Sequence, residues 1–344
     1  MLFRCNLLCL VGGGEVPKWP KNKVMIWDDH QSKCIGELTF RSPVLSCSLR
    51  RDRVCVSLIN RVYVYRFEDL ALLDTFNTTS NARGLLSLSS GEQSVLACPS
   101  TTQGSVRVEN YTTRKSSIIP CHVAPLTTIT LNSSGSLLAT TSSKGTLIRL
   151  HCTRTGSALR ELRRGTEQAT VSCVNFSKDD AWLCCSSDHT TVHVFSIGEN
   201  DDDGGDGDDG EGGKQRNNTS SSSTQSESHI NSKPKKPTLQ PSPPTNQKSP
   251  FRFASPFLPA TLSTYLNSSW SFSKLTNVPP SSTCCFLQTS PPTICVISSD
   301  GGVIKAEFQD GGEARRVGYH RFIRGNDNKL KLDFEEVDKA GGEG

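Results

Sequence analysis

Two adjacent arginines, Arg163 and Arg164, close one β-like repeat and a glycine follows them in the stretch Leu162-Arg-Arg-Gly165. Successive side chains of a β-strand point to opposite faces, so each guanidinium group can enter a different pocket. The arginine fork suits planar, two-point contact with phosphate. An arginine pair alone more often marks a solvated strand end, so the surrounding sequence must decide between these interpretations.

The composition sets broad limits on the class of protein. The chain has 344 residues, of which 34% are hydrophobic and 21% charged, with a formal net charge of +4. This length suits one large domain or two ordinary ones, and the net charge is too small to indicate nucleic-acid binding. No apolar run is long enough for a membrane-spanning helix. The apolar stretch at residues 7–11 is not followed by a small-residue cleavage site, so we expect no signal peptide.

The fourteen cysteines do not resemble a disulfide framework. They form neither a C-x-x-C pair nor a Cys/His cluster with zinc spacing. Free cysteine is among the most buried residue types, and reducing compartments keep it free. We therefore expect buried thiols, no bound metal and a cytoplasmic protein. Nine of the cysteines lie inside apolar β-like runs: Cys47, Cys55, Cys98, Cys152, Cys173, Cys184, Cys185, Cys285 and Cys295.

A repeat of about forty residues organises the chain. Short β-branched strands such as Val62-Tyr-Val-Tyr65 and Val192-His-Val-Phe195 recur, and four of them start at residues 62, 106, 147 and 192. Turns rich in Gly, Ser and Asp separate the strands, and helical periodicity is missing. This pattern predicts an all-β fold, a WD-type β-propeller. Six repeats are recognisable, beginning near residues 1, 40, 82, 122, 169 and 283, and we expect the first to start within a blade.

An inserted segment interrupts the repeat over residues 199–268. It begins with an acidic run over residues 201–209 and continues through serines to the basic, proline-rich run Lys233-Pro-Lys-Lys-Pro237. This composition predicts disorder over residues 199–247, within a loop between the third and fourth strands of one blade. The aspartates fit no EF-hand spacing, so we expect no calcium site. The chain as a whole, residues 1–344, is predicted to be one propeller domain that contains this insertion and ends in a flexible tail over residues 325–344.

An aromatic-rich patch follows the basic run. It carries almost no charge and offers large apolar side chains that could enter a bilayer. Such a patch is a second membrane signal beside head-group binding; the alternative is that these side chains pack on the edge of the propeller. The candidate membrane-inserting residues are Phe251, Phe253, Phe257, Leu258, Leu262 and Tyr265.

With these features together, the chain resembles the PROPPIN family of WD-repeat propellers that bind phosphoinositides in autophagy, and most of all its smaller WIPI-type members. The resemblance covers nearly the whole chain outside the insertion, with its motifs in the family's order. The motifs are residues 22–28 (NKVMIWD), 49–53 (LRRDR), 81–84 (NARG), 139–149 (ATTSSKGTLIR), 162–165 (LRRG), 185–195 (CSSDHTTVHVF) and 269–272 (SWSF).

The resemblance implies two lipid head-group sites that flank the arginine pair. A polyphosphorylated inositol needs cationic forks with hydroxyl donors around them, and the matching positions supply both. A histidine alone is more often structural, but here two lie beside matching Arg, Ser and Thr positions. The first site would use His122, Thr140, Ser142, Lys144, Thr146, Arg149 and Arg163. The second would use Arg164, Ser186, Ser187, Thr190, Thr191 and His193.

Two departures from the family pattern stand out. Thr190 occupies a position where the family has glycine, which could stiffen or crowd the second site. Family members have seven blades, and in them most of a blade lies before the position that matches Met1. The resemblance therefore implies that this N-terminal blade is missing here. We expect this difference to affect closure and stability more than the lipid sites.

The resemblance implies a non-enzymatic effector without a cofactor. It would bind phosphatidylinositol 3-phosphate and phosphatidylinositol 3,5-bisphosphate and act in autophagosome formation. We expect a cytoplasmic monomer, recruited to phagophore, endosomal or lysosomal/vacuolar membranes. Its partners would be autophagy proteins, such as the phagophore lipid-transfer protein, and not nucleic acids. No nucleophile–base motif supports a hydrolase. The alternative function is a WD-repeat scaffold for protein interactions whose lipid binding is lost or weakened.

Overall fold

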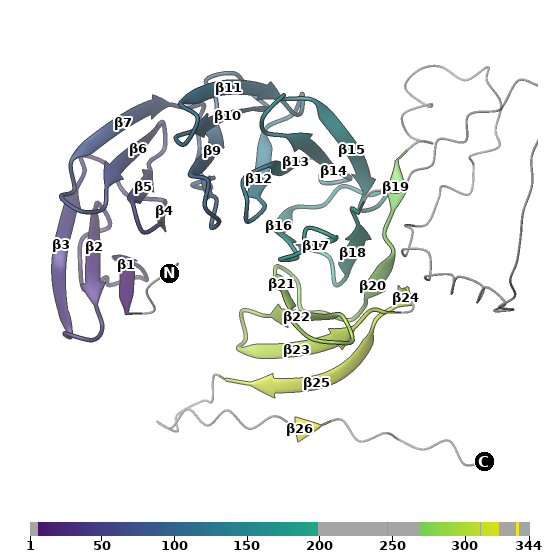
Figure 1. Cartoon of the computed structure of the whole chain (residues 1–344). Coiled ribbons are helices and arrows are strands. Elements are labelled where there is room, and N and C mark those ends of the chain that lie inside the picture. Colours follow the sequence, from purple (N-terminus) through teal and green to yellow (C-terminus); the bar gives the residue numbers. More distant parts are fainter. Residues whose placement is uncertain (1–5, 199–245, 247–267, 310, 323–334, 337–344) are drawn as a thin grey trace, which may run out of the picture. The chain divides into compact units, whose positions relative to one another are not determined.

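The computed structural model describes residues 6–198, 246, 268–309, 311–322 and 335–336. These residues form six β-sheets that follow one another along the chain (Figure 1). Within a sheet, strands that are consecutive in the sequence pair in antiparallel fashion. The predicted all-β propeller fold is confirmed. The chain divides into two units; the six sheets belong to the larger unit, and residues 199–243 lie outside the described residues.

The first three sheets come from the N-terminal part of the chain. The first has three strands, and the next two have four each. The first contains β1 (Leu7–Val11), β2 (Lys23–Asp28) and β3 (Lys33–Thr39). The second contains β4 (Ser46–Leu49), β5 (Arg53–Ser57), β6 (Arg61–Arg66) and β7 (Leu72–Asn77). The third contains β8 (Ser87–Leu88), β9 (Val95–Pro99), β10 (Ser105–Asn110) and β11 (Lys115–Pro120).

The last three sheets each gain a fifth strand. The fourth contains β12 (Leu126–Leu131), β13 (Leu137–Ser142), β14 (Leu147–Cys152), β15 (Ala158–Arg163) and β19 (Ser269–Trp270). The fifth contains β16 (Val171–Phe176), β17 (Trp182–Ser187), β18 (Val192–Ser196), β20 (Ser273–Leu275) and β24 (Gly312–Glu313). The sixth contains β21 (Thr283–Leu287), β22 (Thr293–Ile297), β23 (Gly302–Glu307), β25 (Arg315–Arg321) and β26 (Glu335–Glu336).

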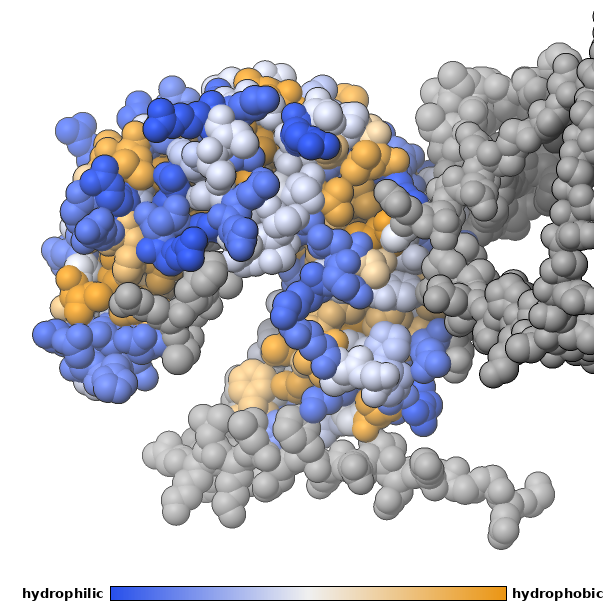
Figure 2. Space-filling model, viewed as in Figure 1, coloured by the Kyte–Doolittle hydropathy of each residue, from blue (hydrophilic) through white to orange (hydrophobic). Residues whose placement is uncertain are grey.

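The hydrophobic core lies between successive sheets. One cluster joins the fourth and fifth sheets, with Ile148, Leu162, Leu183 and Phe195 all fully buried. Similar clusters join the other neighbouring sheets. Because both faces of a middle strand are covered, strands such as β9 and β17 are buried over most of their length and read as apolar runs. On the face seen in Figure 2, hydrophobic and hydrophilic residues gather in small groups beside one another.

The chain returns from the inserted segment between the fourth and fifth sheets. The strand β19 pairs in parallel with the end of β15, through Leu162↔Ser269 and Arg163↔Trp270. A few residues later β20 pairs with β18, so residues 199–268 connect two neighbouring strands of one sheet. The tail predicted over residues 325–344 contains β26, which pairs with β25; its other residues lie outside those described. No helix among the described residues is long and apolar enough to cross a membrane.

A buried arginine, Arg50, joins the second sheet to the third. Its side chain is 2% exposed and donates hydrogen bonds to the backbone carbonyls of Ser89 (2.8 Å), Gly91 (2.7 Å) and Glu92 (2.8 Å). Its Nε also pairs with Asp52 at 2.8 Å. This guanidinium group therefore satisfies the carbonyls of the turn that follows β8.

We expect the variant Arg50→Met to lower the free energy of unfolding by about 3 kcal/mol or more, because several buried carbonyls would lose a charged donor. The matched control is Arg66→Met, since Arg66 is half exposed and pairs with Asp69 on the surface. That change should cost less than about 1 kcal/mol. Urea unfolding measures both; equal stabilities of the two variants would contradict this role of Arg50.

Candidate functional site

The arginine pair lies where the fourth sheet meets the returning segment. Arg163 ends β15, and Arg164 follows it with its backbone N–H bonded to the carbonyl of Thr146 at 2.9 Å. The two side chains are only 5% and 4% exposed. The solvated strand end considered from the sequence is therefore wrong for both residues.

The two guanidinium groups reach different neighbours. Arg163 donates from Nε to Ser268 Oγ at 2.8 Å, just before β19. Arg164 donates from Nε to the carbonyl of Gly145 at 2.7 Å and from Nη2 to the carbonyl of Glu167. These acceptors carry no formal charge. A phosphate oxygen in their place would make stronger, charge-assisted bonds.

The turn between β13 and β14 presents the Gly145 carbonyl to Arg164. Gly145 has a φ of +61°, and a Cβ atom there would lie 1.7 Å from the carbonyl oxygen of Ala169. Only glycine fits this turn. Lys144 on the same turn is exposed, Thr146 is half-buried and Ser142 is buried. The turn thus holds three of the predicted first-site residues close to Arg164.

Three other predicted first-site residues contact one another directly. His122 Nε2 lies 3.1 Å from Thr140 Oγ1, and Thr140 faces Arg149 across β13 and β14. Arg149 pairs with Glu161 at 3.0 Å and donates to the carbonyl of Cys121 at 2.7 Å. Burial, and then the charge of Arg149, lower the pKa of His122 to about 4.

The second group centres on His193 in β18. Its ring is 7% exposed, its Nδ1 lies 3.3 Å from Ser271 Oγ, and it faces Lys274 across the pairing of β18 with β20. Burial lowers the pKa of His193 to about 3, and the charges of Lys274 and Arg164 act in the same direction. The geometry therefore brings Arg164, His193 and Lys274 into one electropositive neighbourhood.

The remaining predicted second-site residues have mixed roles. Ser186 and Ser187 are buried: Ser186 Oγ donates to the carbonyl of Ser282, and the carbonyl of Ser187 accepts from the N–H of Ser281. They therefore connect β17 to the segment that enters the sixth sheet. Thr190, at the family's glycine position, is exposed and Thr191 is half-buried.

Sequence reasoning missed three residues of the returning segment, Ser268, Ser271 and Lys274. The run Ser269-Trp-Ser-Phe-Ser-Lys274 indicates an alternating strand, but nothing in it says which earlier strand it joins. The basic residue Lys274 was the one feature of this run that could have indicated a phosphate-binding role. The predicted membrane-inserting residues Phe251, Phe253, Phe257, Leu258, Leu262 and Tyr265 lie outside the described residues. Among the described residues, no group of three His, Cys, Asp or Glu side chains is arranged to hold a metal.

The two histidines make stability depend on pH. Their pKa values in the folded protein, about 4 for His122 and about 3 for His193, lie below the ordinary value of 6.5. Unfolding therefore takes up a proton at each below that value, and stability falls as the pH falls from 6.5 towards 4. Each histidine can contribute up to about 1.4 kcal/mol per pH unit. Urea unfolding between pH 7.5 and 4.5 measures this dependence. The unfolding free energy should change less steeply with pH in H122Q/H193Q than in the unchanged chain, and an equal steepness would contradict these shifts.

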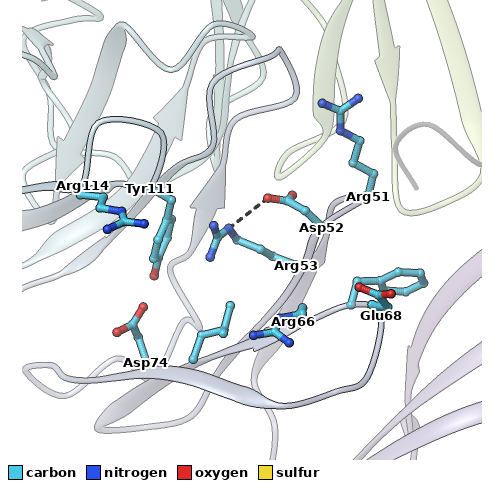
Figure 3. A pocket seen from close by; sticks show the side chains of 10 residues that line it. Arg51, Asp52, Arg53, Arg66, Glu68, Asp74, Tyr111 and Arg114 are labelled. Atoms are coloured by element: carbon cyan, nitrogen blue, oxygen red, sulfur yellow. Dashed lines mark ion pairs between the residues drawn. The ribbon is translucent and has the colours of Figure 1, made fainter.

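A large pocket lies away from this site, on the second and third sheets. It has a volume of about 880 Å³ and is lined by Arg51, Asp52, Arg53, Arg66, Phe67, Glu68, Leu73, Asp74, Tyr111 and Arg114. In Figure 3, the side chains of Arg53, Arg66 and Arg114 border the same space, whereas Arg51 points away from it. Arg53 stacks over the ring of Tyr111, with 3.7 Å from Cζ to the ring centroid, and pairs with Asp52 at 3.2 Å. None of the predicted lipid-site residues lines this pocket.

The fold and the arginine site define a WD-type β-propeller with a basic, hydroxyl-rich cluster between its fourth and fifth sheets. A family model described as PROPPIN matches residues 9–205. The chain belongs to the PROPPIN family, as the sequence motifs indicated.

Named relatives agree with this assignment. Autophagy-related protein 18e of Arabidopsis thaliana is 40% identical over 199 residues, which is 57% of this chain and 53% of the relative. SVP1-like protein 2 of Emericella nidulans is 39% identical over 198 residues, covering 57% of this chain and 62% of the relative. The matches thus span little more than half the length of these relatives.

Solved structures share the fold at low sequence identity. Hsv2 of Kluyveromyces lactis superposes with a TM-score of 0.64 at 18% identity, covering 93% of this chain and 85% of that one. A complex of KlAtg21 with the coiled coil of AgAtg16 gives a TM-score of 0.63 at 19% identity, with 94% and 84% covered.

Proposed function

We propose that this protein is a non-enzymatic phosphoinositide effector that binds phosphatidylinositol 3-phosphate and phosphatidylinositol 3,5-bisphosphate. The observation that carries the proposal is the convergence of Arg164, His193 and Lys274 next to buried hydroxyl groups. A phosphorylated head group would replace the Gly145 and Glu167 carbonyls as acceptor for Arg164. Its charge would also favour protonation of His193, which burial and two cations oppose in the free protein.

A second head group would bind around Arg163 and the residues of the turn between β13 and β14. There Lys144 is exposed and Thr146 is half-buried, and the turn joins the strands that carry Thr140 and Arg149. Arg163 itself hydrogen-bonds Ser268 in the free protein. Lipid binding at this site requires Arg163 to exchange that hydroxyl for a phosphate oxygen.

Liposome flotation tests the proposal directly. The protein should float with vesicles that contain either of the two phosphoinositides and stay in solution with vesicles of phosphatidylcholine and unphosphorylated phosphatidylinositol. Binding should weaken as salt rises, because exposed charges are screened. Equal flotation with all vesicles, or none with any, would refute head-group recognition.

The variant Lys274→Gln should weaken phosphoinositide binding by roughly tenfold, since it removes one charge-assisted contact of about 1.5 kcal/mol. Its matched control is Lys305→Gln, which removes an equal charge from a strand of the sixth sheet. Flotation over a lipid titration measures both variants. An equal loss in the two would mean that general charge, and not a site at Lys274, attracts the protein.

Membrane recruitment through these sites would place the protein at forming autophagic membranes. We propose a cytoplasmic protein that moves to phagophore, endosomal or lysosomal/vacuolar membranes and recruits autophagy proteins, such as the phagophore lipid-transfer protein. The names of the relatives as autophagy proteins support this role.

A second candidate function, a protein-interaction scaffold, is favoured by the arginine-lined pocket. The pocket sets Arg53, Arg66 and Arg114 beside three carboxylates, so it suits a charged, polar segment of a partner protein. One solved neighbour is a complex with a coiled coil, which supports a protein partner. If R66E/R114E leaves flotation unchanged but abolishes capture of an autophagy partner, the chain performs both functions at separate surfaces. If the variant still captures the partner, the pocket does not have this role.

A further inference from the structure

We propose that Cys285 and Cys295 form a redox-reversible disulfide within the sixth sheet. The two residues face each other directly across the antiparallel pairing of β21 and β22. No disulfide is present among the described residues, and both cysteines are free thiols. The site would be a modification site for oxidants of the peroxide class.

The backbone already places the two residues at disulfide distance. Directly opposed residues of antiparallel strands have Cα atoms about 4.5–5.5 Å apart, and disulfides join Cα atoms about 4.4–6.8 Å apart. Because the two residues are directly paired, their side chains lie on the same face of the sheet, and each thiol shifts the pKa of the other. Bond formation therefore needs side-chain rotation and no rearrangement of the sheet.

The surroundings make Cys285 the attacking thiol. The neighbouring Cys295 thiol lowers the pKa of Cys285, which favours the thiolate form of Cys285. Cys285 is half-buried, which leaves a route for a small oxidant. Its neighbour Cys295 has a raised pKa, because of the Cys285 thiol and then burial, and the charge of Lys305 on the next strand opposes this only in part; Cys295 therefore stays a thiol. A thiolate next to a second thiol is the arrangement found in redox-active pairs.

The fully buried cysteines lack these properties. Cys55, Cys98 and Cys185 are inaccessible to solvent, and burial raises the pKa of each. Cys284 precedes Cys285 but points to the opposite face, into the core cluster between the fifth and sixth sheets. Cys9 and Cys47 form another thiol pair, between the first and second sheets, and Cys173 lies next to Cys284, so the experiment must separate three pairs.

The chemistry balances with a peroxide as oxidant. The Cys285 thiolate attacks one peroxide oxygen and becomes a sulfenic acid, while the other oxygen leaves as water after taking up a proton. The Cys295 sulfur then attacks the sulfenic sulfur and displaces a second water. Two thiols and one hydrogen peroxide thus give one disulfide and two waters. A dithiol reductant reverses the bond by exchange.

Mass spectrometry of the full chain tests the assignment. The reduced protein is treated with hydrogen peroxide, its remaining thiols are blocked with iodoacetamide, and it is digested. No Lys or Arg lies between Lys274 and Lys305, so trypsin leaves Cys284, Cys285 and Cys295 in one peptide. In the oxidised protein we expect this peptide to carry one alkylated cysteine, and its two other cysteines to have lost one hydrogen atom each. Chymotryptic cleavage after Phe286 should leave its two halves linked until dithiothreitol is added.

Four variants assign the bond. C285S and C295S should each lose the linked species, whereas C284A and C34S should keep it. Circular dichroism melting checks that each variant folds. If C295S does not fold, the peptide masses of the unchanged chain decide whether the bond forms. A link that survives in C285S, a link through Cys284, or oxidation confined to Cys9 and Cys47 would overturn the proposal.

Discussion

The double variant R163T/R164T is expected to abolish binding to phosphoinositide vesicles, whereas each single variant should keep partial binding. The two guanidinium groups reach different neighbours, Ser268 for Arg163 and Gly145 for Arg164, so each is proposed to serve its own head group. A hydrogen bond to a charged group contributes about 1.5–3 kcal/mol. Losing one at each site reduces the combined affinity by roughly two to four orders of magnitude.

The control for this pair is Arg160→Thr on the same strand. Arg160 is half-buried and donates to the carbonyl of Gly198 at 3.0 Å, so it carries the same charge away from the proposed sites. Threonine keeps a side chain that suits β-strands, and circular dichroism melting verifies that each variant folds. Undiminished flotation of the folded double variant would refute the assignment of both arginines.

Replacing Phe257, Leu258 and Leu262 by serine should reduce vesicle binding by about tenfold or more, with or without calcium. One lipid head group rarely holds a protein on a bilayer, and a second signal is needed for stable attachment. The segment from Phe251 to Tyr265 offers such apolar side chains. Lys233, Lys235 and Lys236 before it add about 1 kcal/mol each near an anionic surface.

A matched control changes Thr261, Ser263 and Thr264 of the same segment to alanine. This variant alters as many side chains without removing large apolar ones, and we expect its binding to stay close to that of the unchanged chain. If the serine variant also binds normally, the apolar residues pack on the propeller edge instead. If binding appears only with calcium, the aspartates of residues 201–209 bind calcium, which their spacing argued against.

The repeat was predictable from sequence because each strand carries its own signal. Strands that begin with Val62 and Val192 alternate valine with aromatic residues or histidine, and the structure places β6 and β18 at these positions. The cluster of His122, Thr140 and Arg149 was also within reach, since the family resemblance implied all three; β13 and β14 pair Thr140 with Arg149, and His122 precedes their sheet.

Contacts across the insertion were not predictable. Arg163 and Ser268 are separated by 105 residues, and the sequence between them contains no repeat that fixes where the chain returns. The same holds for Lys274, whose position opposite His193 depends on the pairing of β20 with β18. The pairing of Cys285 with Cys295 likewise depends on strand register, which composition and spacing leave open among fourteen cysteines.

The number of head groups bound per chain is the most direct test of the central claim. Isothermal titration calorimetry with soluble inositol 1,3-bisphosphate avoids the membrane and therefore the inserted segment. We predict two head groups bound by the unchanged chain, one by R163T, one by R164T and none by R163T/R164T. A single head group on the unchanged chain, or a stoichiometry that neither arginine alters, would contradict two phosphoinositide sites flanking this pair.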